Sequence, residues 1–399
     1  MDPRHERVVL KFGGSSVSSP ERIAAVARRI SRFWERGSQV IVVVSAMGDT
    51  TDRLLKLALR TAPGGQCLRE LDQLLATGEQ QSIALVAMAL QELGVESLSF
   101  SGAQAGISAS GRHCEGRIRS IDPDRLLRSI NEGMVPVVAG FQAQDEVGDV
   151  ITLGRGGSDL SAIAVAAAVK ADVCYIFTDV DGIYTADPRV VEKARKLDYI
   201  SWDECLEMTV AGAQVLQARS VEMAIRSGVN VCVASSDEEK EGTWIMKDCV
   251  EERAAVRAVS QDDDAARVAF DDTIDPCRVA RALSERGIVA QIVVQGGRAV
   301  FLIRRSLLDE TLAVCRELNA SGLSWDDGLS RVSVVGVGLV NHPEISSQIL
   351  SVLEEIGVAV EMFLSSALSM TCVIRATHSV KAVRALHGKF LEGGIVLCA

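Results

Sequence analysis

The sequence contains few aromatic residues and no long uninterrupted apolar run. Phe, Trp and Tyr make up 4% of the chain, so its cores must be built mainly from Val, Ala, Leu and Ile. A membrane-spanning helix needs about 20 consecutive apolar residues, and the longest candidate, IAVAAAVKADVCYIF, is interrupted by Lys170 and Asp172. The N-terminal segment MDPRHERVVLKFGG lacks the apolar core of a signal peptide. We therefore expect no membrane partner.

The chain also lacks a basic excess and the cysteine patterns of metal or disulfide proteins. Asp and Glu outnumber Lys and Arg by 53 to 42. The resulting net charge of −11 argues against a nucleic-acid partner, because phosphate backbones are bound by a Lys/Arg excess. The 10 cysteines include no Cys-x-x-Cys pair, and the 5 histidines show no ligand spacing. We expect no metal site, and mostly buried thiols in a reducing cytoplasm.

Strand and helix signals alternate from residue 7 to residue 234. Continuous β-branched runs such as residues 39–45 (QVIVVVS) indicate strands covered on both faces in a parallel sheet. The alternation predicts an α/β fold, a three-layer sandwich with a largely parallel central sheet. Strands are predicted at residues 7–12, 39–45, 97–100, 135–139, 173–178 and 229–234, and helices at 20–33, 82–93, 158–170, 202–208 and 211–227.

A weak internal repeat follows an acid-rich stretch (residues 237–264), which we interpret as a solvated connection. Each copy has a strand, a helix that starts at a proline, a glycine stop, another strand and a second helix. This pattern predicts two ferredoxin-like βαββαβ modules. Pro276 and Gly287 are 11 residues apart, whereas Pro343 and Gly357 are 14 apart, so the first helix is about one turn shorter. The expected domains are residues 1–248, 249–328 and 329–399.

Two turns after predicted strands carry residues suited to binding an anion. In Lys11-Phe12-Gly13-Gly14-Ser15-Ser16, glycines let the backbone approach an anionic oxygen, amides at a helix entrance donate to it, and the lysine adds a positive charge. An ordinary strand-to-helix turn explains this segment about equally well. After the second strand, Ser45 and Thr51 offer small hydroxyls where a ligand crevice is expected. A helix N-cap at residue 49 or 50 is the simpler explanation there.

Residues 153–159 (LGRGGSD) form a second glycine-rich turn, before an Ala-rich helix. The glycines free backbone amides, Ser158 or Asp159 caps the helix, and Arg155 can hold a carboxylate through two parallel hydrogen bonds. Packing explains an arginine among three glycines poorly, so we interpret this turn as an anion site. Glu79, in the motif LLATGE, is expected at a helix start, where it could bind an amino group. A favourable charge near the helix dipole is the simpler explanation for Glu79.

Residues 178–189 (TDVDGIYTADPR) combine an aromatic side chain, turn residues and an arginine in one loop. They lack the ligand spacing of a calcium loop. Such a loop can hold a nucleotide base and its phosphates, or it can be an ordinary surface turn. Together the four segments suit phosphoryl transfer from a nucleotide to a small anionic acceptor. That reaction depends on positioning and charge neutralisation and needs no covalent nucleophile from the protein.

The motifs KFGGSSV, VVVSAMGDTTD, LLATGE, FSGAQAG, TLGRGGSD and FTDVDGIYTADPRVV, in this order, resemble those of the aspartate kinase family, in the amino-acid-kinase superfamily. The C-terminal repeat resembles that family's paired ACT domains. The resemblance implies that ATP phosphorylates the side-chain carboxylate of L-aspartate to 4-phospho-L-aspartate, the first step of the aspartate-family amino acid pathway. It also implies that Mg²⁺ arrives with the nucleotide, and that the protein is a cytoplasmic homo-oligomer joined through its ACT domains.

The resemblance assigns roles to residues by their position in these motifs. Lys11 and Asp159 are implied to be catalytic. L-aspartate is implied to bind to Ser45, Thr51, Glu79, Arg155 and Ser158. ATP is implied to bind to Gly13, Gly14, Ser15, Thr178, Asp179, Tyr184, Asp187, Arg189 and Gln214. No residue is assigned to a metal ion.

Some positions depart from the family pattern. Gln214 stands where the family has a lysine that contacts nucleotide phosphate, so we expect weaker ATP binding or an altered rate. In the second ACT repeat, NHPE replaces Ser-His-Pro-Gly and LSSA replaces Ser-Thr-Ser-Glu. We predict that feedback by lysine or threonine is weakened or re-specified. The expected effector residues are Asn341, His342, Ser365 and Ser366.

Two other functions stay open. The chain could phosphorylate a different acidic substrate, because one methylene changes binding by only about 1–3 kcal/mol in an apolar pocket. It could instead be a non-catalytic amino-acid sensor that uses the ACT pair. Gln214 and the altered first repeat favour the sensor, whereas Lys11 and the intact LGRGGSD motif speak against it.

Overall fold

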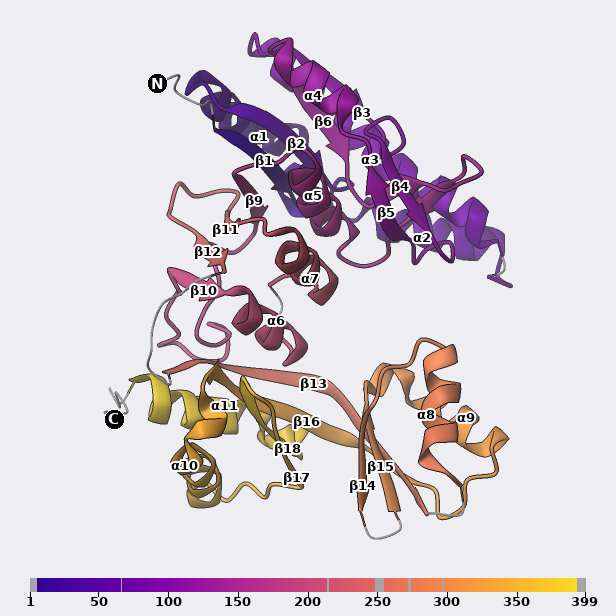
Figure 1. The fold of residues 1–399 in the computed structure, drawn as a ribbon, viewed down its shortest axis with the longest axis vertical. Helices are drawn as coiled ribbons and strands as arrows, with labels where there is room; N and C mark the ends of the chain where they lie inside the picture. Colours follow the sequence, from indigo (N-terminus) through magenta and orange to yellow (C-terminus); the bar gives the residue numbers. More distant parts are fainter. Residues whose placement is uncertain are drawn as a thin grey trace. The chain divides into compact units, whose positions relative to one another are not determined.

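The computed structural model describes residues 6–65, 67–213, 215–247, 255–271, 274–295 and 298–392. The chain divides into two compact units (Figure 1). The predicted domain boundaries at residues 248 and 328 stay predictions. The first unit comprises Met1–Ile183, Lys196–Leu206 and Gln214–Val250, and the second comprises Tyr184–Arg195, Glu207–Ala213 and Glu251–Ala399.

An eight-stranded sheet forms the centre of the first unit, in the order β10-β12-β11-β9-β1-β2-β6-β3. The strands from β11 to β3 in this order all run parallel, and β12 pairs antiparallel with β11. The predicted largely parallel sheet is confirmed. The strands are β1 (Arg7–Phe12), β2 (Gln39–Val44), β3 (Ser97–Phe100), β6 (Val135–Ala139), β9 (Val173–Thr178), β10 (Tyr199–Ser201), β11 (Val231–Ser235) and β12 (Thr243–Met246).

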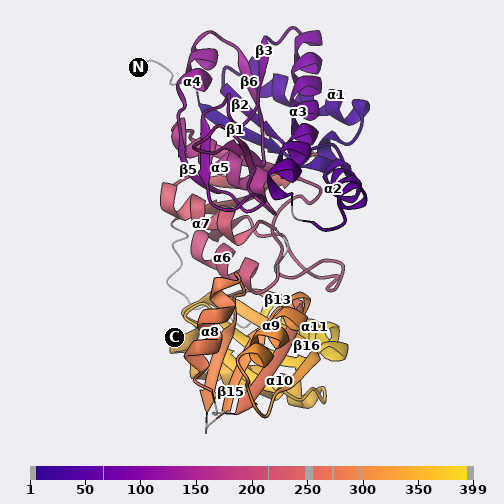
Figure 2. The same ribbon diagram turned by 90° about the vertical axis from the view of Figure 1, so that its right-hand side faces the viewer.

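Helices cover both faces of this sheet (Figure 2). Val8, Leu10 and Phe12 of β1 pack in one apolar core with α1 (Pro20–Glu35) and α3 (Leu68–Glu92). Because side chains alternate along a strand, Lys11 points to the opposite face, where α5 (Gly157–Ala168) packs over β1, β2 and β9. The other helices are α2 (Thr50–Thr61), α4 (Asp124–Asn131), α6 (Trp202–Val210) and α7 (Ala218–Ser227).

A second, four-stranded sheet of the first unit leads the chain into the turn that carries Arg155. Its strand order is β5-β4-β7-β8, and its last strand ends at Thr152, three residues before Arg155. The position of this turn therefore depends on this small sheet. The strands are β4 (Ile107–Ser110), β5 (Arg117–Ile121), β7 (Gln142–Gln144) and β8 (Val150–Thr152).

Helix α3 begins at Leu68, whereas the sequence pattern predicted a start at residue 82. The helix therefore includes Gly78, although glycine is a poor helix former. In the structure Gly78 serves close packing: a Cβ at Gly78 would lie 2.9 Å from the Cβ of Ala46. The missing side chain lets α3 approach the turn after β2, and this places Glu79 beside that turn.

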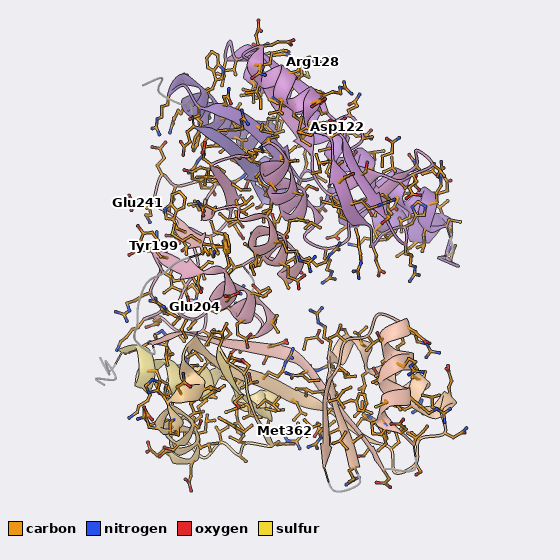
Figure 3. All side chains as sticks on the ribbon, viewed as in Figure 1. Asp122, Arg128, Tyr199, Glu204, Glu241 and Met362 are labelled. Carbon is orange, nitrogen blue, oxygen red and sulfur yellow. The ribbon has the colours of Figure 1, made fainter. Side chains whose placement is uncertain are left out.

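The predicted helix at residues 211–227 starts late, at Ala218. Helix α6 ends at Val210. Gly212 then has a φ of +103°, a backbone conformation that is incompatible with a right-handed helix. The start of α6 has a capping-box arrangement, in which Ser201 N donates to the Glu204 carboxylate at 3.0 Å (Glu204 is labelled in Figure 3). In the described part of the chain, the structure offers no helix with both the length and the apolar character needed to cross a bilayer.

A six-stranded antiparallel sheet forms the second unit, in the order β14-β15-β13-β16-β18-β17. Two helices pack against it in one apolar core and two in another, as two ferredoxin-like repeats require. The predicted shorter first helix is confirmed, since α8 has 10 residues and α10 has 13. The helices are α8 (Pro276–Glu285), α9 (Leu308–Glu317), α10 (Pro343–Glu355) and α11 (Ser379–His387). The strands are β13 (Ala255–Asp271), β14 (Gln291–Gln295), β15 (Arg298–Ile303), β16 (Ser324–Val337), β17 (Met362–Ser365) and β18 (Ser369–Arg375).

The acid-rich run at residues 262–264 lies inside β13, so its interpretation as a connection was wrong. Partners on neighbouring elements compensate the negative charges. Asp262 pairs with Arg331 of β16, and Asp264 accepts a hydrogen bond from Ser306 N at 3.0 Å. The register between β13 and β16 shifts between Asp262 and Ala265, which lets the acidic side chains reach these partners.

Candidate active site

Lys11 lies one residue before the end of β1, and its side chain is almost fully buried beside α5. Only 7% of the residue is exposed. Its Nζ lies 2.5 Å from Oδ1 of Asp159, in the first turn of α5. Parallel pairing places Lys11 between Val43 of β2 and Ile176 of β9, near the carboxyl ends of the strands. A desolvated ammonium at this edge of a parallel sheet, beside a helix entrance, favours an anionic ligand.

The glycine pair after β1 leaves room beside this ammonium. A Cβ at Gly13 would lie 3.6 Å from Lys11 Nζ, and a Cβ at Gly14 would lie 2.7 Å from Ala46 O. Gly14 O accepts a hydrogen bond from Gly48 N at 3.0 Å, so the turns after β1 and β2 are joined. Ser15 is exposed in the short 3-10 helix that follows. The structure thus brings these two turns together next to Lys11.

The hydroxyl residues predicted to bind substrate after β2 lie on this joined turn. Ser45 N donates to Phe12 O at the end of β1, at 3.1 Å. Thr51 lies in the first turn of α2. Asp49 occupies the N-cap position of α2, but its side chain makes no capping hydrogen bond with any described residue. The N-cap explanation therefore applies only to Asp49, by its position. It does not explain Ser45 or Thr51, because neither residue is the N-cap of α2.

Glu79 lies in the middle of α3, so its predicted place at a helix start was wrong, and a helix-dipole role does not apply. Its Oε1 accepts a hydrogen bond from Ala46 N at 3.1 Å. Its Oε2 is buried and has no hydrogen-bond partner among the described residues. Burial raises the pKa of Glu79 to about 8. Because a buried carboxylate oxygen without a partner is costly, this position suits a positively charged amino group.

Two glycines shape the turn that carries Arg155. Gly154 and Gly156 have φ values of +75° and +70°, which glycine adopts without strain. A Cβ at Gly156 would lie 2.1 Å from Cγ of Gln217, so no larger residue fits there. Arg155, between the two glycines, is exposed. The turn therefore presents a guanidinium group at the entrance of α5.

The N-cap of α5 is Gly156, so the predicted cap by Ser158 or Asp159 was wrong. Both residues lie inside the first turn of the helix. The carboxylate of Asp159 is engaged by Lys11, and Ser158 packs against Gly140, where a Cβ would lie only 2.8 Å from Ser158 Oγ. These positions direct two polar side chains toward the ends of β1 and β6.

The residues predicted to bind the nucleotide fall into two groups. Thr178 ends β9 and Asp179 follows it, both in the first unit. Thr178 Oγ1 donates to Asp179 Oδ1 at 2.9 Å. Tyr184, Asp187 and Arg189 belong to the segment Tyr184–Arg195, which is part of the second unit. Their common role stays a prediction.

Asp187 and Arg189 form a two-pronged ion pair. Nε and Nη2 of Arg189 lie 3.0 and 2.7 Å from the carboxylate oxygens of Asp187. The hydrogen bonds from Arg189 lower the pKa of Asp187. A phosphate that binds Arg189 must therefore share the guanidinium with this carboxylate. Gln214, the remaining predicted nucleotide residue, lies outside the described residues.

The segment Tyr184–Arg195 is anchored in the core of the second unit, and two of its apolar side chains are buried there. Thr185 Oγ1 lies 3.0 Å from Nε2 of His387, a fully buried residue at the end of α11. Nδ1 of His387 lies 3.1 Å from the carboxylate of Glu392, which also pairs with Lys193 at 2.8 Å. The end of α11 thus fixes a segment that carries predicted nucleotide residues.

The predicted effector residues lie in two places of the second unit. Asn341 and His342 precede α10. Ser365 and Ser366, at the end of β17, line a pocket that also includes Glu207. Ser366 Oγ donates to the Glu207 carboxylate at 3.0 Å. The structure brings the two serines together, and the residues that line this pocket do not include Asn341 or His342.

A buried polar cluster surrounds Asp72 of α3, and no sequence motif indicated it. Its carboxylate lies within hydrogen-bond distance of His113 Nδ1, Cys114 N and Thr152 Oγ1. These partners come from two segments, His113–Cys114 and Thr152, which lie 41 to 80 positions away from Asp72 along the chain. No local spacing connects them, so only the tertiary structure could reveal the cluster.

Comparison with known families agrees with this two-part architecture. The profile of the amino acid kinase family matches residues 6–235, and the profile of an ACT domain matches residues 332–390. An aspartokinase of Geobacillus stearothermophilus is 41% identical over 394 residues, which cover 96% of this chain and 97% of that protein. An aspartokinase of Corynebacterium glutamicum is 41% identical over 407 residues, which cover 97% of this chain and 96% of that protein.

Solved structures share the fold over nearly the whole chain. E. coli aspartokinase III in complex with aspartate and ADP superposes with a TM-score of 0.83 at 24% identity, covering 96% of this chain and 99% of that chain. An aspartate kinase from Synechocystis is 37% identical, with a TM-score of 0.56, covering 98% of this chain and 70% of that chain.

Proposed function

The chain belongs to the aspartokinases, within the amino acid kinase family, and we propose that it transfers the γ-phosphoryl group of ATP to the side-chain carboxylate of L-aspartate. It is a phosphotransferase with a carboxyl group as acceptor. A carboxylate oxygen of aspartate bonds to the γ-phosphorus, and the bond between that phosphorus and the bridging oxygen breaks. The products are 4-phospho-L-aspartate and ADP, and the reaction opens the aspartate-family amino acid pathway.

One observation carries the proposal: the Lys11 ammonium lies against the Asp159 carboxylate and beside Gly13, where two loops and a helix start meet. Phosphoryl transfer needs fixed positive charge and backbone donors around the phosphoryl oxygens, and it needs no protein nucleophile. Lys11 supplies the charge, and the glycine pair lets backbone amides approach. Asp159 holds the ammonium in place before the phosphates bind.

The acceptor is held at both ends by charges of opposite sign. Oε2 of Glu79, which is buried and has no hydrogen-bond partner in the described part of the chain, binds the amino group of aspartate. The exposed guanidinium of Arg155 binds a carboxylate. Ser45, Thr51 and Ser158 supply hydroxyl groups to the same ligand. An ammonium group beside Glu79 favours the ionised carboxylate and so opposes the effect of burial on its pKa.

The nucleotide is bound by Thr178, Asp179, Tyr184, Asp187 and Arg189, with a hydrogen bond from Gln214 in place of a lysine. Mg²⁺ enters with ATP and is coordinated mainly by phosphate oxygens, as is usual for this ion. In the part of the chain that the structure describes, no group of three His, Cys, Asp or Glu side chains is placed to hold a metal ion.

The C-terminal unit provides regulation and assembly. Its ACT domain suits amino-acid binding and pairing with a second copy. The protein is proposed to act as a homo-oligomer in the cytoplasm. Its effector response is weakened or re-specified, because Asn341, His342, Ser365 and Ser366 stand in altered loops.

Trapping of the acyl phosphate by hydroxylamine tests the proposal. We expect purified protein with ATP, Mg²⁺ and L-aspartate to form aspartyl hydroxamate and an equal amount of ADP, and Lys11→Ala to form almost none. If kcat/KM were higher for glutamate or another acid than for aspartate, that acid would be the substrate and the proposal of aspartate would be wrong. Absence of turnover with every acid, together with amino-acid binding by the C-terminal unit, would favour the sensor.

A further inference from the structure

Asp72 is a fully buried carboxylate on α3 that accepts several hydrogen bonds away from the proposed reaction centre. It is 0% exposed. Its oxygens lie 2.7 Å from His113 Nδ1, 3.0 Å from Cys114 N and 2.5 Å from Thr152 Oγ1. A buried carboxylate with this many donors is well satisfied and fixes the groups that donate to it.

Two of these donors hold the turn that carries Arg155. Thr152 is the last residue of β8, and its carbonyl accepts a hydrogen bond from Gly116 N at 2.8 Å. The carbonyl of Cys114 lies against Gly154, where a Cβ would be only 3.1 Å from it. Asp72 therefore fixes both the strand that enters the turn and the loop on which the turn rests.

The backbone of Cys114 shows that this loop depends on Asp72. Cys114 has a φ of +70°. This left-handed conformation is energetically unfavourable for any residue that has a side chain. Its amide N donates to both oxygens of Asp72, at 3.1 and 3.0 Å. The carboxylate thus stabilises a backbone conformation that the loop would otherwise avoid.

The same helix presents Glu79, and Asp72 and Glu79 are both buried on one face of α3. They are seven residues apart, which is two helical turns or about 10 Å. We propose that Asp72 is a positioning residue, which sets the Arg155 turn at a fixed distance from Glu79 and so selects an amino acid of the length of aspartate. This inference rests on the proposed function, because it assumes that Arg155 and Glu79 hold the two ends of one substrate.

The matched variants Thr152→Val and Thr152→Ser test the proposal, because Val removes the hydroxyl at almost constant volume and Ser keeps it. Thr152 is fully buried and is not among the residues assigned to substrate or nucleotide. We expect hydrogen exchange of the amides at residues 153–157 to be faster in Thr152→Val than in the wild type, and unchanged in Thr152→Ser.

The kinetic readout distinguishes positioning from a general loss of stability. In Thr152→Val we expect the KM for aspartate to rise about tenfold, as when one hydrogen bond to a charged group is lost, with the KM for ATP unchanged. We also expect the ratio of kcat/KM for aspartate over glutamate to fall, because a looser turn admits the longer acid. Wild-type exchange and kinetics in Thr152→Val would overturn the proposal, and so would equal effects in the Val and Ser variants.

A second pair of variants guards against a failure of Thr152→Val to fold. His113 is partly exposed, with 24% of its side chain accessible, so His113→Ala should fold. His113→Asn keeps a donor near the position of Nδ1 and is expected to restore the exchange and the kinetics. The exchange measurement is independent of the substrate. If the wild type fails to phosphorylate aspartate while exchange still responds to Thr152→Val, the proposed function fails and the selection of aspartate fails with it, but the role of Asp72 in fixing the Arg155 turn stands.

Discussion

Nζ of Lys11 and Oδ1 of Asp159 lie 2.5 Å apart, although 148 residues separate them in the sequence. The pair joins the end of β1 to the first turn of α5, and both side chains are largely buried. Because a buried charge is tolerated only with a partner, Asp159 offsets the cost of burying the Lys11 side chain and orients it in the free protein. During phosphoryl transfer, phosphate oxygens can then take the place of Asp159 beside Lys11, or bind Lys11 together with it.

Removal of the Lys11 charge should impair the chemical step. We expect Lys11→Met to lower kcat by about 10²- to 10³-fold, the range seen when one preorganised electrostatic donor is removed. Lys11→Arg, which keeps the charge, should retain more activity. Initial rates of ADP formation measure both variants, and thermal unfolding checks that they fold. A kcat within twofold of wild type for Lys11→Met would exclude Lys11 from the reaction centre.

The stability of the protein should depend on pH through Glu79. Burial raises the pKa of Glu79 from 4.5 to about 8 in the folded chain. Between these values the folded state holds a proton that the unfolded state has lost, so stability falls as the pH rises through this window. Glu79→Gln removes this dependence. We expect the free energy of unfolding of the wild type, relative to Glu79→Gln, to decrease by up to a few kcal/mol, at about 1.4 kcal/mol per pH unit.

Urea unfolding over that pH range, without aspartate, measures this difference. Parallel pH profiles of the wild type and Glu79→Gln would show that Glu79 titrates normally. An added amino acid substrate should reduce the pH dependence, because its ammonium group favours the ionised carboxylate.

The close approach of α3 to the turn after β2 should be sensitive to one added methyl group. A Cβ at Gly78 would lie 2.9 Å from the Cβ of Ala46. An alanine in a helix interior normally gains about 1 kcal/mol over glycine, but forced overpacking costs about 1–3 kcal/mol. We expect Gly78→Ala to be destabilised and to bind aspartate more weakly, because the hydrogen bond from Ala46 N to Glu79 lengthens.

The exposed neighbour Thr77 supplies the control for this substitution, since Thr77→Ala raises helix propensity without new contacts. Chemical denaturation and the KM for aspartate measure both variants. If Gly78→Ala were as stable and as active as Thr77→Ala, tight packing at this position would not matter for the site.

His387 should couple the C-terminal unit to nucleotide binding. It is fully buried, and its ring nitrogens face Thr185 and Glu392. His387→Leu leaves the Thr185 hydroxyl without this partner, which costs about 1–3 kcal/mol. We expect a lower melting temperature and a raised KM for ATP, with the KM for aspartate little changed. Equal changes in both KM values would indicate general destabilisation and no specific effect on segment Tyr184–Arg195.

Feedback by lysine or threonine should be weak. Glu344 lies in the first turn of α10, where its own backbone hydrogen bond and then His342 lower its pKa. A carboxylate at a helix start opposes the binding of a second carboxylate there. We expect activity with millimolar lysine, threonine or both to stay close to the uninhibited rate. Strong inhibition by either amino acid would show that the altered loops still bind the effector.

Local patterns predicted the central sheet of the first unit well. The strands at residues 7–12, 97–100, 135–139 and 173–178 agree with β1, β3, β6 and β9. For β1, β6 and β9 the reason is that a largely buried apolar run is visible in the sequence itself, whereas β3 is a half-exposed edge strand. The same reasoning placed Lys11 and Ser45 at the ends of neighbouring parallel strands, which share one carboxyl edge of the sheet. The LGRGGSD turn follows β8 of the small sheet, and its convergence with Lys11 is visible only in the structure, through the ion pair of Lys11 with Asp159.

Long-range contacts explain what the sequence did not show. The sequence did not show that α3 continues through Gly78, because the packing partner of Gly78, Ala46, is distant in sequence. The acids of residues 262–264 looked solvated, because their partners Arg331 and Ser306 are supplied by other elements. The Asp72 cluster has no local signature at all. Its members meet only after the two sheets and α3 of the first unit have assembled.

The most direct test of the account follows the carboxylate oxygen that accepts the phosphoryl group. L-aspartate labelled with ¹⁸O in its side-chain carboxylate is incubated with ATP, Mg²⁺ and the protein, and the products are observed by ³¹P NMR. The account predicts an acyl phosphate signal that carries the isotope shift of one bridging ¹⁸O. It also predicts that this signal is lost in Lys11→Met. Release of unlabelled inorganic phosphate, with no acyl phosphate, would contradict it.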